Sequence, residues 1–153
     1  WMLGYQKIFG NQYFDFIQET AGMYLANSVG VDYNAPHESS IQLRYDLNGN
    51  AAGFPGYKLI LWGIRGSGVD GSLEAQKYAA PTHPLYDLYR KSGEPIRGGN
   101  HEIGVKQTYT VQSGSLKNSK LSLVIMGRKI NGLYPSKTFS DLRLMIDVPI
   151  TLF

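Results

Sequence analysis

Apolar and polar residues alternate along much of the chain with a period of two. In residues 41–48, Ile, Leu, Tyr and Leu fall on one face, and Gln, Arg, Asp and Asn fall on the other. Residues 142–152 repeat the pattern with a row of Leu, Ile and Val. A β-strand turns successive side chains to opposite faces, so both segments are predicted to be strands with one apolar face. We predict further strands at residues 1–9, 57–65, 102–112 and 120–129.

The connections between these strands alternate between short and long. Residues 48–56 and 113–119 have the length and composition of tight turns. Residues 10–40, 66–101 and 130–139 are longer, and the first two far exceed ordinary connections. Short turns on one side and long loops on the other are typical of an up-and-down transmembrane β-barrel. An even number of strands would end the chain on the short-turn side, which in such barrels is the periplasm.

The composition excludes several other classes. Charged residues make up 18% of the chain, which is low for a protein with a large solvated surface. No apolar stretch approaches the ~18 residues of a transmembrane helix. The net charge of +3 is modest and scattered, so no nucleic acid is expected as a partner. The chain has no Cys, and its three His lack metal-ligand spacing, so we expect no metal and no cofactor.

Catalysis is not expected, and one soluble fold competes with the barrel. Ser, His and Asp are present, but no nucleophile motif such as G-x-S-x-G occurs, so the chain is not predicted to be an enzyme. A soluble β-sandwich that binds a ligand would also show alternating strands and turns. The unbroken apolar rows and the aromatic Phe153 directly after a strand favour the barrel. Because six strands are too few to close a barrel, we expect further strands before Trp1.

Six stretches of the sequence resemble the outer-membrane carboxylate channel family, also called the porin D family. They occur in the family's order, near its spacing, from the first residues to the last. The stretches are Leu3-Gly4-Tyr5-Gln6-Lys7, Leu25-Ala26-Asn27-Ser28-Val29, Gln42-Leu43-Arg44-Tyr45-Asp46-Leu47, Gly53-Phe54-Pro55-Gly56, Val111-Gln112-Ser113-Gly114 and Leu142-Arg143-Leu144-Met145-Ile146-Asp147-Val148-Pro149.

The resemblance implies an all-β, eighteen-stranded, monomeric barrel in the outer membrane of a Gram-negative bacterium. Residues 1–153 would be the C-terminal portion of that one domain, about its last six strands. It also implies passive uptake of small water-soluble solutes that carry a carboxylate, with no cofactor and no covalent step. The expected partners are these solutes, outer-membrane lipid and lipopolysaccharide, and the barrel-assembly machinery, which would recognise Phe153.

The resemblance also implies a row of cations along one inner wall, which would guide a carboxylate. The residues of this chain that match the row or share its face are Arg143, Lys106, Arg44 and Arg128. Arg44 has Asp46 on the same face, which could neutralise it. Where the family often carries two Arg, this chain has Val124 and Met126, so the row is thinner and a less discriminating pore is implied.

Residues 10–40 resemble the infolded loop that narrows the pore in this family, while residues 66–101 and 130–139 are expected outside the cell. Within the constriction loop, Asp32 matches the acidic pore position, and Tyr33 and Ser28 are expected beside it. The alternative for Asp32 is that it caps a turn before Asn34-Ala35-Pro36, as Asp commonly does.

Alternation also predicts which way the side chains point. The rows containing Leu43, Tyr45, Leu144, Ile146 and Val148 should face away from the barrel axis, and Arg44, Arg143 and Asp147 should face toward it. Tyr109, Tyr45 and Trp62 are expected in the aromatic girdles at the lipid headgroups.

Overall fold

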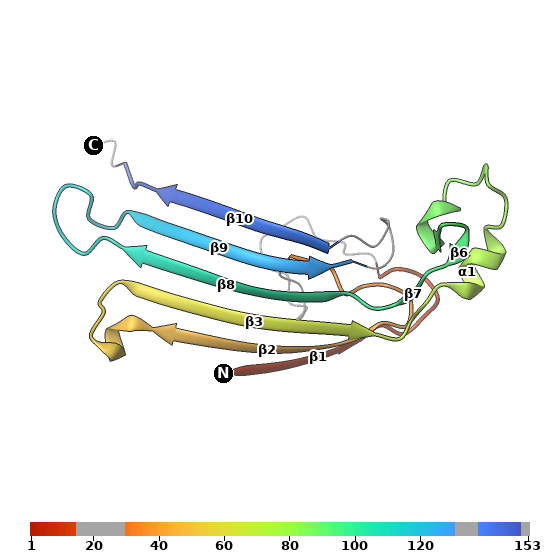
Figure 1. Ribbon diagram of the computed structural model, residues 1–153, viewed down its shortest axis with the longest axis horizontal. Coiled ribbons are helices and arrows are strands. Elements are labelled where there is room, and N and C mark those ends of the chain that lie inside the picture. Colours follow the sequence, from red (N-terminus) through yellow and green to blue (C-terminus); the bar gives the residue numbers. More distant parts are fainter. Residues whose placement is uncertain (15–29, 131–137, 151–153) are drawn as a thin grey trace.

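A computed structural model describes residues 1–14, 30–130 and 138–150, and its main feature is one six-stranded sheet (Figure 1). The sheet is antiparallel throughout, in the order β1-β2-β3-β8-β9-β10. Each of these strands therefore pairs with the next long strand along the chain, as in an up-and-down barrel. The bounds are β1 Met2–Lys7, β2 Ser39–Asn48, β3 Tyr57–Ser67, β8 His101–Thr110, β9 Lys120–Lys129 and β10 Thr138–Asp147.

All six predicted strands are present, and the last one is shifted from its predicted position. Strand β10 begins at Thr138 and ends at Asp147, instead of spanning 142–152. Its ladder runs from Thr138 opposite Lys129 to Asp147 opposite Lys120, so its end coincides with the start of β9. The apolar alternation continues past Asp147, but a strand requires a hydrogen-bonded neighbour, and β9 supplies none there. Strand β10 begins within the predicted loop at 130–139, because β9 continues to Lys129 and pairs there with Thr138.

Two short connections lie at one end of the sheet. Between β2 and β3, the 3-10 helix η1 (Gly49–Ala52) begins with the Asn48 side chain accepting from the Asn50 amide at 3.1 Å. Gly53 follows at a φ of 79°, a conformation that glycine adopts without strain. Between β8 and β9, the Val111 amide donates to the Ser119 carbonyl at 2.9 Å. Both predicted turns are therefore confirmed.

The long connection after β3 has secondary structure of its own (Figure 1). It contains the ladder of β4 (Val69–Asp70) with β7 (Arg97–Gly98), helix α1 (Ser72–Lys77), the 3-10 helix η2 (Asp87–Tyr89), and the hairpin of β5 (Arg90–Lys91) with β6 (Glu94–Pro95). Ala35 from the preceding long connection packs with Val69 and Ile96 in a small core. The two long connections are therefore joined to each other. No described helix is long and apolar enough to cross a membrane.

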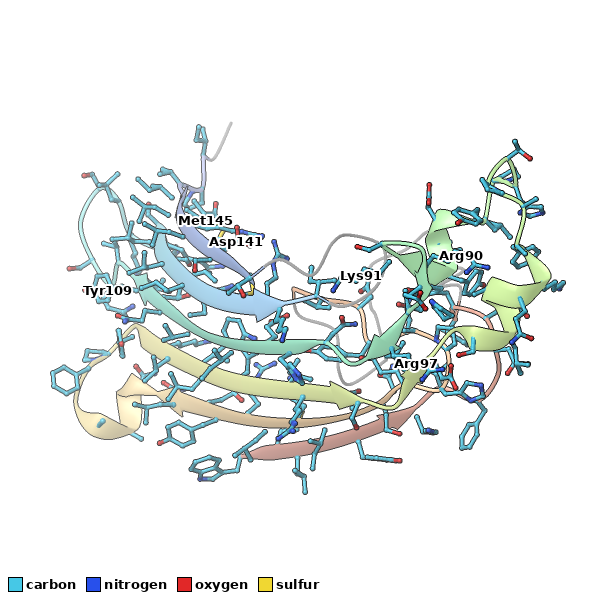
Figure 2. The ribbon with its side chains drawn as sticks, turned by 45° about the vertical axis from the view of Figure 1, so that its right-hand side comes forward. Arg90, Lys91, Arg97, Tyr109, Asp141 and Met145 are labelled. Atoms are coloured by element: carbon cyan, nitrogen blue, oxygen red, sulfur yellow. The ribbon has the colours of Figure 1, made fainter. Side chains whose placement is uncertain are left out.

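The sheet is curved like part of a cylinder wall, and its two faces differ in chemistry (Figure 2). Leu43, Leu144 and Ile146 lie on one face and are 53%, 66% and 70% exposed. Arg44 and Arg143 lie on the opposite face, where they line a common hollow. We call this side of the sheet the inner face and its opposite the outer face. The predicted orientation is therefore confirmed, and no second sheet covers the outer row within the described residues, as a β-sandwich would require.

Trp62 differs from its predicted position, because it lies on the inner face and not in an outer aromatic girdle. It is 6% exposed and stands opposite Arg44 and Gly104 in the ladders of β3. An added Cβ at Gly104 would overlap the indole ring, so glycine makes room for it. Strand β3 is apolar on both faces, and alternation alone therefore could not show which face Trp62 occupies. Tyr109, by contrast, is 45% exposed, beside the short turns.

Residues 30–38, which precede β2, are folded against the inner face. Val31 and Tyr33 are 6% and 1% exposed and pack with Trp62, Ile64, Val124 and Met126 in the main core. These partners come from β3 and β9, so the segment crosses over the wall of the sheet instead of extending away from it. This packing fixes where the polar groups of the segment lie.

Candidate functional site

Three of the four cations expected in the basic row come together on the inner face. Arg44 from β2, Lys106 from β8 and Arg143 from β10 line one hollow of about 470 Å³. Trp62 and Met126 are also part of its lining. The shared orientation follows from register, because Lys106 stands opposite Val124, and Val124 stands opposite Arg143. We call this hollow the inner hollow.

The three cations of the inner hollow differ in how far they are neutralised. Arg44 forms a two-pronged pair with Asp46, with Nη2 to Oδ1 at 2.6 Å and Nε to Oδ2 at 2.9 Å. The alternative reading of Arg44 as a neutralised charge therefore matches the structure. Arg143 makes a looser pair with Asp141 at 3.3 Å and has a 55% exposed side chain. Among the described residues, the Lys106 ammonium has no ion-pair partner.

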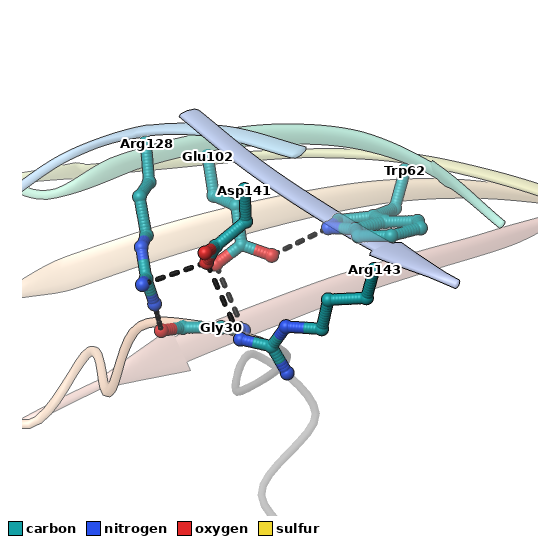
Figure 3. Close-up of polar contacts among 6 residues, drawn as sticks. All are labelled: Gly30, Trp62, Glu102, Arg128, Asp141 and Arg143. Carbon is teal, nitrogen blue, oxygen red and sulfur yellow. Dashed lines mark hydrogen bonds and ion pairs between the residues drawn. The ribbon is translucent and has the colours of Figure 1, made fainter. Parts of the chain in front are cut away.

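Arg128 does not line the inner hollow. Instead it contacts residues 30–38, which we call the folded-in segment (Figure 3). Its Nη1 donates to the Gly30 carbonyl at 2.6 Å, and its Nη2 pairs with Asp141 at 2.8 Å. Asp141 is thus shared between Arg128 and Arg143. Sequence reasoning missed Asp141, although its place two residues before Arg143 on the same strand put it on the same face.

A buried carboxylate, Glu102 at the start of β8, holds the same segment from the other side (Figure 3). It is 4% exposed. Its Oε1 accepts from Trp62 Nε1 at 2.5 Å, and its Oε2 accepts from the Gly30 amide at 2.9 Å. Burying a carboxylate is costly unless donors replace its water, and these two donors do so. Sequence reasoning missed Glu102 as well, although it shares its face with Lys106, four residues on.

The three residues expected at the constriction have different surroundings. The Asp32 side chain is exposed, and its backbone carbonyl accepts from Asn100 Nδ2 at 3.3 Å. Tyr33 is buried, with its hydroxyl 3.5 Å from the Ile64 carbonyl. Its ring therefore anchors the segment within the core. Ser28 lies outside the described residues.

Glu38 joins the bases of both long connections. It is fully buried, and its carboxylate accepts from the Asn100 amide at 3.0 Å, from Asn100 Nδ2 at 3.4 Å and from the Ala35 amide at 3.3 Å. Burial raises the pKa of the Glu38 carboxyl to about 7, and the donors of Asn100 and Ala35 oppose part of the rise. The carboxyl therefore titrates near neutral pH, at the point where the segment meets the wall.

Val124 and Met126, at which the sequence implied a gap in the basic row, form an apolar strip of the wall. They are 9% and 4% exposed and carry the packing of Val31 and Tyr33. Within the described ranges, no three His, Asp or Glu side chains gather as a metal ion would require. The inner face therefore carries two accessible cations, an apolar strip covered by Val31 and Tyr33, and the exposed Asp32.

Comparison with known proteins gives consistent matches along the whole chain. The sequence model of a family described as outer membrane porin, OprD family, matches residues 1–152. Porin D of Pseudomonas aeruginosa is 31% identical over 159 aligned residues, which cover 98% of this chain and 34% of that protein. Among solved structures, P. aeruginosa OccD3 is 34% identical with a TM-score of 0.78, covering 99% of this chain and 36% of the other. An improved structure of P. aeruginosa OprD is 31% identical with a TM-score of 0.77, covering 99% and 39%. The chain spans about a third of the length of these relatives.

Proposed function

We propose a solute channel as the function of this chain, which belongs to the OprD family of outer membrane porins. Porins of this family are proteins of the Gram-negative outer membrane, and they are channels rather than enzymes. In this proposal the six strands form part of the channel wall, with the outer face toward lipid and the inner face toward the pore. The channel gives passive, substrate-preferring diffusion to small water-soluble solutes that carry a carboxylate.

The observation that carries the carboxylate preference is the placement of Lys106 and Arg143 on one face. Both line the inner hollow, and the first has no counter-charge among the described residues while the second has only a loose one. A pair between exposed charges is weak, so Arg143 keeps most of its attraction for an anion. Cations in a confined pore raise the local concentration of anions. Several sites of moderate strength also let the solute leave again.

The folded-in segment supports the proposal from the other side of the pathway. Its packing on β3 and β9 brings Asp32 over the inner face with the side chain exposed. In the proposal, residues 10–40 narrow the pore, and Asp32 supplies a negative charge near its narrowest point. A solute would then meet cations on the wall and an acidic group on the segment.

The proposal also includes the remaining expected partners. The exposed apolar outer row, including Leu144 and Ile146, would contact outer-membrane lipid. The long connections would lie outside the cell, near lipopolysaccharide, and the channel would act as a monomer. Phe153, which lies outside the described residues, would be recognised by the barrel-assembly machinery.

The proposal is tested by replacing Arg143 with Ala in the full-length channel. A carboxylate about 5 Å from a guanidinium in water is attracted by ~0.8 kcal/mol, which corresponds to about a fourfold effect. Uptake of benzoate into proteoliposomes should therefore slow by up to that factor, and the loss should fade as salt screens the charge. Uptake of benzamide, a neutral solute of the same shape, should not change. Equal slowing of both solutes, or of neither, would contradict the carboxylate preference.

A further inference from the structure

The backbone of Gly30 is held at both its amide and its carbonyl by charged residues of the wall. Its amide donates to Glu102 Oε2 at 2.9 Å, and its carbonyl accepts from Arg128 Nη1 at 2.6 Å (Figure 3). Glu102 belongs to β8 and Arg128 to β9, and these strands are neighbours in the sheet. We call the arrangement of Gly30, Glu102 and Arg128 the Gly30 clamp.

Each charged residue of the Gly30 clamp is itself tied to the wall. Glu102 also accepts from Trp62 Nε1, and Arg128 also pairs with Asp141 at 2.8 Å. The second contact of each residue fixes the direction of the first, so the clamp is anchored on strands β3 and β10 as well. Hydrogen bonds to charged groups are stronger than those between neutral groups. Because Glu102 and Arg128 are already held by their second contacts, their side chains lose little conformational entropy on binding Gly30.

The backbone at Gly30 approaches the wall so closely that a larger residue would have to displace the end of the Met126 side chain. An added Cβ at position 30 would overlap Met126 Sδ and lie 3.0 Å from Glu102 Oε2. The backbone there lies almost directly on the wall. Immediately after the clamp, Val31 enters the main core at 6% exposure, and Asp32 remains exposed.

We propose that the Gly30 clamp is the positioning device that holds residues 30–38 on the inner face and so sets the width of the pore. Arg128 and Glu102 act through the segment and not by touching the solute. This assignment removes Arg128 from the row of solute-guiding cations and gives it a different task. The inference rests on the proposed function in one respect, namely that the inner face lines the pore.

The clamp is tested by a readout that responds to position and not to charge. This chain has no Cys, so Val31→Cys in the full-length channel, freed of any other cysteine, gives a buried thiol whose labelling by a water-soluble maleimide reports release of the segment. Arg128→Lys keeps the charge, but one ammonium cannot serve both Gly30 and Asp141 as the guanidinium does. We expect labelling to accelerate about tenfold, a factor equivalent to ~1.4 kcal/mol, in line with the loss of a charged hydrogen bond.

A second variant and a control sharpen the test. Glu102→Gln replaces one accepting oxygen by an amide donor, so it should also accelerate labelling of Val31→Cys. Lys129→Gln removes a cation from the adjacent exposed position of β9 and should leave labelling unchanged. In planar bilayers, Arg128→Lys should raise single-channel conductance while ion selectivity stays close to that of the unmodified channel.

The outcomes separate the clamp from the proposed function. Unchanged labelling in both Arg128→Lys and Glu102→Gln would overturn the clamp, and so would equal acceleration in Lys129→Gln. If Arg128→Lys and Glu102→Gln accelerate labelling but the unmodified full-length protein shows no channel current, the proposed function is overturned and the clamp stands.

Discussion

Replacement of Asp141 by Asn is a direct test of how charge on the inner face governs selectivity. The carboxylate of Asp141 pairs with Arg128 at 2.8 Å and with Arg143 at 3.3 Å, and its side chain is 28% exposed. Asn keeps an oxygen that can accept from both guanidinium groups, so the local geometry should persist. The change therefore removes one negative charge from the wall with little change of shape.

The magnitude follows from Coulomb's law in a watery pore. One additional net positive charge about 8 Å from a passing anion attracts it by ~0.5 kcal/mol in water, or about a twofold rise in local anion concentration. The reversal potential of the full-length channel in a KCl gradient should shift toward anion preference by a corresponding amount. The shift should shrink as ionic strength rises, because the Debye length falls to about 3 Å at 1 M salt.

A control distinguishes the effect of this position from that of net charge. Glu94→Gln, in hairpin strand β6 of the long connection between β3 and β8, removes the same charge from a position that does not line the inner hollow. It should leave the reversal potential unchanged. If Asp141→Asn gives no shift, or if Glu94→Gln gives an equal one, then Arg143 does not govern selectivity in the way that its position suggests.

Three further predictions address the segment and its support. Asp32→Asn should raise anion preference in reversal-potential measurements, whereas unchanged selectivity would assign Asp32 to turn capping. The pKa of Glu38 is raised by burial to about 7, so its stabilising protonated form is fully present below pH ~4.5 and lost as pH rises through about 7. The protection of residues 30–38 against hydrogen exchange, relative to the intrinsic exchange rate at each pH, should fall over that interval, and Glu38→Gln should remove this fall. Gly104→Val should destabilise the channel by ~1–3 kcal/mol through overlap with Trp62, as measured by thermal unfolding in detergent, while Gly63→Ala, which meets nothing within 4 Å, should not.

The strands and the orientation of their side chains could be predicted, because a sheet with one apolar face shows apolar–polar alternation within each strand. Alternation in 41–48 was enough to place Arg44 on the inner face and Leu43 on the outer face. The end of β10 could not be predicted in the same way, since it depends on where the partner strand β9 begins. Trp62 was misplaced because its strand is apolar on both faces, and only the register opposite Gly104 decides its side.

The candidate site was predictable only in part, because its contacts join distant positions. Arg44, Lys106 and Arg143 could be grouped by face and resemblance. Their pairing could not be foreseen beyond Arg44 with Asp46, which are two residues apart on one strand. The partnership of Arg128 with Gly30 spans 98 residues of sequence, and nothing local marks it. The sequence around Glu102 is that of an ordinary polar residue at a strand end, and it gives no sign that the side chain is buried.

The contacts of Glu38 with Asn100 have a consequence for how this protein can vary. They bring together the end of one long connection and the end of the next, where strands β2 and β8 begin and β3 ends. The Gly66 amide also donates to the Asn100 carbonyl at 2.6 Å, so the long connection between β3 and β8 is closed at its base independently of its tip. Lengthening a loop whose ends are already fixed costs only about 0.6 kcal/mol for each doubling. The part of this connection around η2 and the β5–β6 hairpin can therefore accept insertions and exchange its exposed residues while the wall keeps its shape.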